Sequence, residues 1–129
     1  MTLVRVSYNA LSGDVMGQIG ESGQARFIPH TDELLLYVRR DDPTRLMGFQ
    51  LEDAKESLSR HAKWFNDHLG ADFVGEVATL LDKAADVDLN EVADEDLEKV
   101  LPSTYVRLEV EVPQLDDRIE LDAYRDWVR

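Results

Sequence analysis

The chain has no cysteine, no long hydrophobic run and few basic residues. Without cysteine, it has neither a disulfide framework nor a thiolate that could act as a nucleophile or metal ligand. No apolar segment approaches the roughly 18 residues that a membrane-spanning helix needs, and the first residues lack the apolar core of a signal peptide. We therefore expect a cytoplasmic protein without a membrane partner.

Basic side chains are outnumbered, with 14 against 27 acidic ones and a formal net charge of −13. Residues 1–64 hold nine acids and eight bases, whereas residues 65–129 hold eighteen acids and six bases. A field of this sign repels nucleic-acid phosphates, which predicts no nucleic-acid partner. It would attract a basic protein, although a solubility-promoting surface explains the same charge.

Enough apolar residues are present, at 43% of 129, to bury the core of one domain spanning residues 1–129. Residues 1–52 predict a β-meander, because apolar positions alternate in several short stretches. One predicted strand covers residues 15–19, and Gly20–Gly23 suits a hairpin loop that leads into the next strand. Leu34–Val38 is apolar on both faces, which favours a central strand covered on one side by helix.

The strand predicted over residues 46–51 places Met47, Phe49 and Leu51 on one face. Gly48 within it indicates a β-bulge or a close approach of two backbones.

Between residues 52 and 101 the apolar period changes to that of helices. One stripe steps by three or four residues, through Leu51, Ala54, Leu58, Ala62, Phe65 and Leu69. Gly70 would end this first helix, a second would cover residues 72–85, and a third would end before Pro102.

Residues 104–112 alternate strictly and predict a strand that returns to the N-terminal sheet, because a lone strand is not stable. Residues 114–129 predict a short C-terminal element. The fold class is therefore α+β, with an antiparallel β-sheet covered on one face by two or three helices.

Three histidines are the first candidates for chemistry. His61 and His68 share a helix face with Trp64 between them, and two helical turns separate them by about 10.5 Å. This spacing is too long for one metal ion, so we predict no metal site, no cofactor and a surface pair beside a partly buried tryptophan. His30 lies in a loop and could join either of them in space.

Other polar candidates lie on the face of the strand over residues 104–112 that we expect to be exposed to solvent, where Arg107 and Glu109 accompany Glu111. They could bind a ligand or act as an acid/base pair, although an exposed sheet face explains the alternation equally. Trp64, Tyr105 and Trp127 are candidate interface anchors, with core packing as the alternative. No serine has the local context of a catalytic nucleophile.

The first 54 residues contain a tyrosine-led turn over residues 8–16, the apolar strand Leu34–Val38, and a glycine-centred strand running into an acidic segment over residues 45–54. In these stretches the chain resembles a family of small bacterial proteins built on β-hairpins. Asn9 stands where that family has an acid. The resemblance implies an N-terminal sheet and brings no activity with it.

Two functional hypotheses follow. The first is a non-enzymatic protein-binding or regulatory module with a basic partner, such as an immunity or antitoxin-like protein. The second is a small enzyme or ligand-binding protein with a site between sheet and helices, formed by His30, His61, His68, Arg107 and Glu109. Whether the chain is an enzyme stays open, with the first hypothesis favoured. A homo-oligomer is compatible with both.

Overall fold

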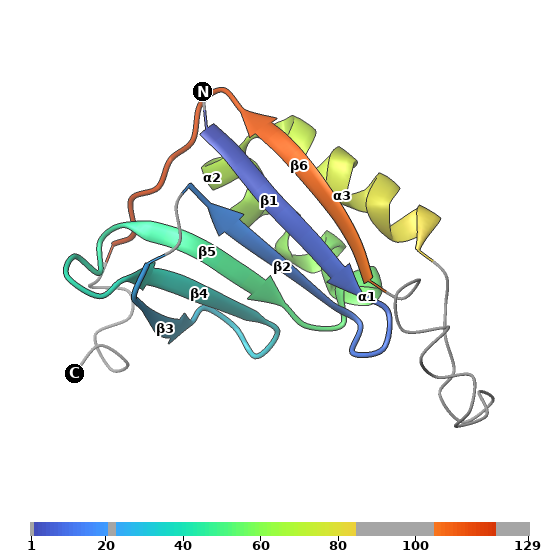
Figure 1. Cartoon of the computed structure of the whole chain (residues 1–129), viewed down its shortest axis with the longest axis horizontal. Coiled ribbons are helices and arrows are strands. Elements are labelled where there is room, and N and C mark those ends of the chain that lie inside the picture. The colour runs from blue at the N-terminus through green and yellow to red at the C-terminus, as the bar shows by residue number, and fades with distance from the viewer. Residues whose placement is uncertain (1, 21–22, 85–104, 121–129) are drawn as a thin grey trace.

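The computed structural model describes residues 2–20, 23–84 and 105–120, and its main feature is one six-stranded antiparallel sheet (Figure 1). The strands are β1 (Thr2–Asn9), β2 (Asp14–Ile19), β3 (Ala25–Pro29), β4 (Leu34–Arg39), β5 (Leu46–Leu51) and β6 (Tyr105–Val112). Their order across the sheet is β3-β4-β5-β2-β1-β6. The helices lie behind one face of this sheet, so the predicted α+β class is confirmed.

The returning strand pairs with the first strand along its whole length. Val4 lies opposite Val110 and Val6 opposite Leu108, so apolar positions of β1 and β6 share one face. Polar positions share the other face, where Arg5 is opposite Glu109. The strict alternation of β6 therefore predicted its place correctly, because a one-residue slip would have put every apolar side chain in water.

The predicted hairpin at Gly20–Gly23 is wrong. β2 pairs with β1 and β5, whereas β3 pairs with β4 at the sheet edge. Strands β1 and β2 thus form one hairpin, strands β3 to β5 form a separate run, and the two units meet along β2 and β5. A glycine-rich loop marks a chain reversal, but it does not show which strands pair across it.

Two glycines allow β2 and β5 to pack closely. A Cβ at Gly48 would lie 2.3 Å from the carbonyl oxygen of Gly17, so the predicted close approach is confirmed. A Cβ at Gly17 would lie 2.2 Å from the ring of Phe49, which occupies that space on the helix side. The predicted bulge is also present, because the β4–β5 register shifts so that Val38 lies opposite Leu46. The sequence predicted Met47 on the same strand face as Phe49 and Leu51. This prediction is wrong, because the bulge turns Met47 away from the helices.

The helical layer follows β5 directly. It comprises α1 (Ala54–Ser57), a 3₁₀ helix η1 (Ser59–His61), α2 (Ala62–Leu69) and α3 (Ala71–Lys83). Gly70 separates α2 from α3 with a φ of 90°, a value that favours glycine. The end predicted for the first helix is therefore confirmed.

The single first helix that the stripe predicted is broken near residue 58. The ring Nδ1 of His61 bonds the carbonyl oxygen of Ser57 at 2.9 Å, where a helix would place the backbone N–H of residue 61. That N–H instead bonds the carbonyl of Leu58 at 3.2 Å, which makes a 3₁₀ turn.

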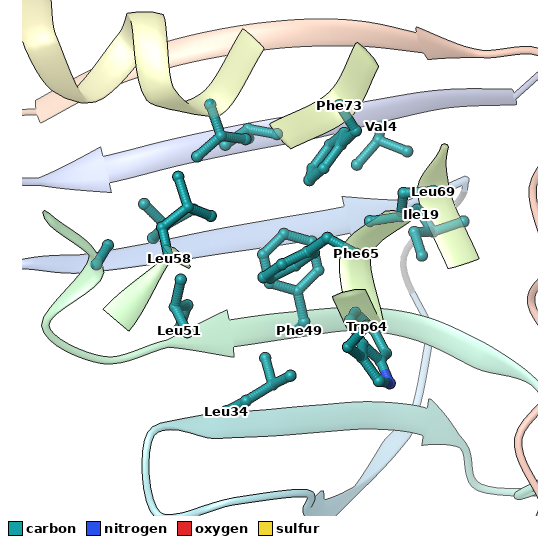
Figure 2. Packing of buried hydrophobic residues seen from close by; sticks show 14 of the residues in the cluster. Val4, Ile19, Leu34, Phe49, Leu51, Leu58, Trp64, Phe65, Leu69 and Phe73 are labelled. Atoms are coloured by element: carbon teal, nitrogen blue, oxygen red, sulfur yellow. The ribbon is translucent and has the colours of Figure 1, made fainter. Parts of the chain in front are cut away.

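Aromatic side chains form the centre of the core between sheet and helices (Figure 2). The ring of Phe49 from β5 lies 4.9 Å from that of Phe65 and 5.9 Å from that of Phe73. Trp64 packs beside Phe65 at 5.1 Å. Such edge-to-face contacts add to the large apolar area that these rings remove from water.

None of the helices in the described ranges is long and apolar enough to cross a membrane. The third predicted helix and the last nine residues, Trp127 included, lie outside the described residues. Residues 113–120 run back along the end of the sheet. Ile119 is buried there, and the backbone of Arg118 forms an isolated antiparallel β-bridge with that of Arg45.

Candidate functional site

The sheet face that no described helix covers carries an unusual set of apolar side chains. We call it the open face, and it is the side toward which Arg5, Ser7 and Tyr37 point. Its most exposed large apolar side chains are Leu3, Met16 and Phe27, at 38%, 43% and 64% of full exposure. These three are all of the strongly exposed large hydrophobic side chains among the described residues, so the exposed apolar area is concentrated on one surface.

A shallow hollow of about 660 Å³ lies on the open face. Its wall combines apolar side chains with charged ones, among them Arg5, Met16, Tyr37, Met47, Arg107 and Glu109. The bulge in β5 contributes directly, because it turns Met47 toward this side. A hollow bordered by flexible methionines and an aromatic ring suits an apolar side chain of another molecule.

A chain of polar groups crosses the open face beside the hollow. The Tyr37 hydroxyl donates to Oε1 of Gln50 at 2.6 Å, and Nε2 of Gln50 donates to Asp14 at 3.2 Å. Partial burial, and then the negative charge of Asp14, raises the pKa of the Tyr37 hydroxyl. The hydroxyl therefore stays neutral near pH 7, and the phenol ring remains an apolar surface with a fixed polar edge.

On the other side of the sheet, the structure brings the three histidines together around Trp64. The Trp64 ring lies 4.6 Å from that of His68 and 6.0 Å from that of His30. Burial, followed by the nearby His61 and His68, lowers the pKa of His30. His30, which the sequence allowed to join either helical histidine, thus lies on the same side of the sheet as both.

His61 is buried, at 6% exposure, which corrects the expectation of a surface pair. A carbonyl only accepts, so in the neutral ring Nδ1 carries the proton toward Ser57 and Nε2 faces the Thr31 hydroxyl at 2.7 Å. His68 donates from Nδ1 to the carbonyl of Asp116 at 2.8 Å. Both rings thus tie loops to the helical layer.

These contacts favour a structural role for the histidines. The Thr31 hydroxyl that faces His61 also accepts from the backbone N–H groups of Glu33 and Leu34, so it serves as a turn cap. Within residues 2–20, 23–84 and 105–120, no three histidine or acidic side chains are grouped closely enough to hold a metal ion. No histidine lines the hollow on the open face. No histidine lines a second pocket either, which lies at the end of the sheet beside Arg26, Arg39 and Arg45.

The five residues expected to share a site fall into two groups. His30, His61 and His68 are close together on the helix side. Arg107 and Glu109 line the hollow on the open face. The six-stranded sheet separates the groups, so one pocket between sheet and helices does not collect all five.

The three candidate interface anchors have different outcomes in the structure. Trp64 is buried at 9% exposure and belongs to the core, the alternative considered for it. Tyr105 begins β6, where its backbone pairs with that of Asn9. Trp127 lies outside the described residues.

Sequence reasoning missed Phe27, Met16 and Tyr37 as a shared surface. The signal existed in the alternation of two of their strands, because Met16 and Tyr37 occupy positions between buried residues. Their juxtaposition depended on strand order: Phe27 lies directly opposite Tyr37 across β3 and β4, with ring centroids 5.0 Å apart.

No family model, curated protein or solved structure matches this chain. The resemblance of residues 1–54 to β-hairpin proteins therefore stays a prediction. The chemistry of the described residues carries the functional argument.

Proposed function

We propose that this chain is a non-enzymatic protein-binding module that docks a basic partner protein on its open face. One observation carries the proposal: Leu3, Met16 and Phe27, the most exposed large apolar side chains, all belong to that face. Met16 lines the hollow and Phe27 contacts Tyr37 in its wall, and exposed apolar side chains beside a hollow are typical of surfaces that another protein covers. Aromatic and methionine side chains are also enriched where binding energy is concentrated.

The charge of the chain supports a basic partner over a second copy. Each copy carries −13, so two copies repel each other at long range, whereas a positively charged protein is attracted. Acidic groups also accompany the apolar ones on the open face, where Asp14 lies in β2 and Glu109 and Glu111 lie in β6, the two strands on either side of β1. Such complementarity raises association rates and selects among partners. An immunity or antitoxin-like inhibitor of a basic toxin is one form of this module.

The alternative, a small enzyme or ligand-binding protein with a site between sheet and helices, receives less support. Its candidate groups are divided by the sheet, and the buried His61 already uses both ring nitrogens in contacts with Ser57 and Thr31. An imidazole held in this way fixes a loop and lacks a nitrogen for substrate.

A photo-crosslinking experiment tests the docking surface. A benzoylphenylalanine replaces Phe27 in one variant and Lys63 in the matched control, because the Lys63 side chain is 91% exposed on the helical layer. Both full-length variants are irradiated in lysate of the source organism, and the crosslinked products are identified by mass spectrometry.

We expect position 27, and not position 63, to capture one basic protein. That protein, once purified, should bind the chain with an affinity that falls as salt rises. Equal crosslinking from both positions, or capture of a second copy of the chain at position 27, would contradict the proposal.

A further inference from the structure

Arginine is concentrated at one end of the sheet, in a chain whose net charge is strongly negative. A pocket of about 1030 Å³ there is lined by Arg26, Arg39, Arg40 and Arg45. These are four of the ten arginines of the whole chain, and among the described residues that line the pocket there is no lysine and the acidic groups are Asp41 and Asp117. We call this site the arginine pocket. A surface that serves solubility alone would mix charges of both signs.

Two of the four arginines are already held by acids. Arg39 bonds Asp41 at 3.2 Å, and Arg45 bonds Asp117 at 2.8 Å. Arg26 and Arg40 form no ion pair within the ranges that the structure describes. Counted over the described residues, the pocket lining therefore has two more positive than negative groups.

The backbone that carries these arginines is fixed on several sides. The Arg39 N–H bonds the Arg45 carbonyl at 2.9 Å and closes the β4–β5 turn. The Arg40 N–H reaches Gln24 at 3.2 Å, which joins the turn to the segment before β3. The Leu46 N–H bonds the carbonyl of Asp117 at 2.7 Å, which joins it to the segment after β6.

The turn itself is also ordered by side chains. The carboxylate of Asp42 accepts from the Thr44 hydroxyl at 2.5 Å and from its N–H at 3.2 Å. These bonds are the main cause of a lowered pKa at Asp42, and Arg45 and Arg39 add to the effect. Because the guanidinium groups extend from an ordered frame, a ligand would lose little free energy in organising the site.

We propose that the arginine pocket binds a small molecule that carries a diphosphate or two separate phosphate groups. Guanidinium groups match phosphate oxygens with paired hydrogen bonds, and arginine without lysine is the composition suited to that recognition. Arg26 and Arg40 would bind the ligand first, while the acids hold Arg39 and Arg45 in position.

The volume and charge of the molecule favour a small ligand over a nucleic acid. The pocket is at the upper end of the size range of small-molecule sites. A long strand would extend beyond the pocket into the field of a chain with a net charge of −13, which repels its further phosphates. This proposal does not depend on the protein-binding role of the open face.

Isothermal titration calorimetry with the purified full chain tests the proposal. Pyrophosphate and adenosine diphosphate are the phosphate probes, citrate is a control anion without phosphate, and a single-stranded oligonucleotide represents a polyanion. At about 50 mM salt, where screening is modest, we expect both phosphate probes to bind. Citrate and the oligonucleotide should bind at least tenfold more weakly.

The variant R26S/R40S should weaken phosphate binding at least tenfold. The matched control K63S/K83S removes the same charge from exposed positions on the helical layer and should change it less than twofold. Urea unfolding checks that both variants keep the native fold. Absence of phosphate binding, equal loss in both variants, or tighter binding of citrate or the oligonucleotide would overturn the proposal.

Discussion

On the helix-covered face of the sheet, Phe49 is completely buried and contacts Phe65 and Phe73 from two helices. On the open face, Phe27 is 64% exposed and has an edge contact with Tyr37 of the neighbouring strand. Both phenylalanines belong to strands of the same antiparallel sheet. The two side chains differ because α2 and α3 cover one face of the sheet, whereas no described element covers the other face.

This contrast separates two uses of apolar side chains. Burial against helices contributes to the free energy of folding, because the rings leave water when the chain folds. An exposed ring contributes little to folding and can still lose water when a partner docks. Substitutions on the two faces should therefore affect different measurements.

The largest expected effect is the loss of Phe49. Phe49→Ala should lower the free energy of unfolding by about 4 kcal/mol, because the ring fills the centre of the core. Phe27→Ala, the matched change on the open face, should lower it by less than about 1 kcal/mol. Urea denaturation of both variants measures the two values. Similar losses would mean that the open face is part of the folding core.

Close packing between β2 and β5 gives the next effect. Gly17→Ala should cost about 2 kcal/mol, because the added Cβ would meet the Phe49 ring at 2.2 Å. Gly75→Ala is the control: it lies exposed in α3 with nothing within 4 Å of an added Cβ. Helix propensity there should instead raise stability by about 1 kcal/mol. Thermal unfolding would refute the packing argument if both changes had the same sign.

A smaller effect concerns pH on the helix-covered side. Burial, together with His61 and His68, lowers the pKa of His30 from its ordinary 6.5. The unfolded chain therefore binds that proton more readily, so His30 should make the protein less stable as pH falls through about 6.5. Urea midpoints at about pH 7.5 and pH 5.5 should differ more for the native chain than for His30→Gln. An unchanged difference in the variant would assign the acid sensitivity to other groups.

Much of the architecture was predictable because alternation and helical periodicity are local. The pattern of Val106 to Val112 predicted a strand that returns to the N-terminal sheet, and Gly48 indicated a bulge or a close backbone approach, of which the structure has both. The pairing of β2 with β5 was not predictable from these signals, because alternation identifies a strand and its buried face but not its neighbours in the sheet. The break near His61 depended on one side-chain hydrogen bond that no periodicity reveals.

The candidate sites were less predictable because they are made by strand order. The sequence left open whether His30 joins a helical histidine; the structure places it beside Trp64, whereas Arg107 and Glu109 lie on the opposite face. The arginine pocket arises where the β4–β5 turn meets β3 and the segment after β6. The adjacent Arg39 and Arg40 gave a local signal, whereas Arg26 joins them only through the pairing of β3 with β4.

The most direct test of the docking claim is the dissociation constant of the captured basic partner for the variant M16S/F27S. Both side chains are exposed, so the variant should keep its free energy of unfolding within about 1 kcal/mol. We predict that the dissociation constant rises at least tenfold, because an interface loses its central apolar contacts. A dissociation constant equal to that of the native chain would contradict the assignment of the open face as the docking surface.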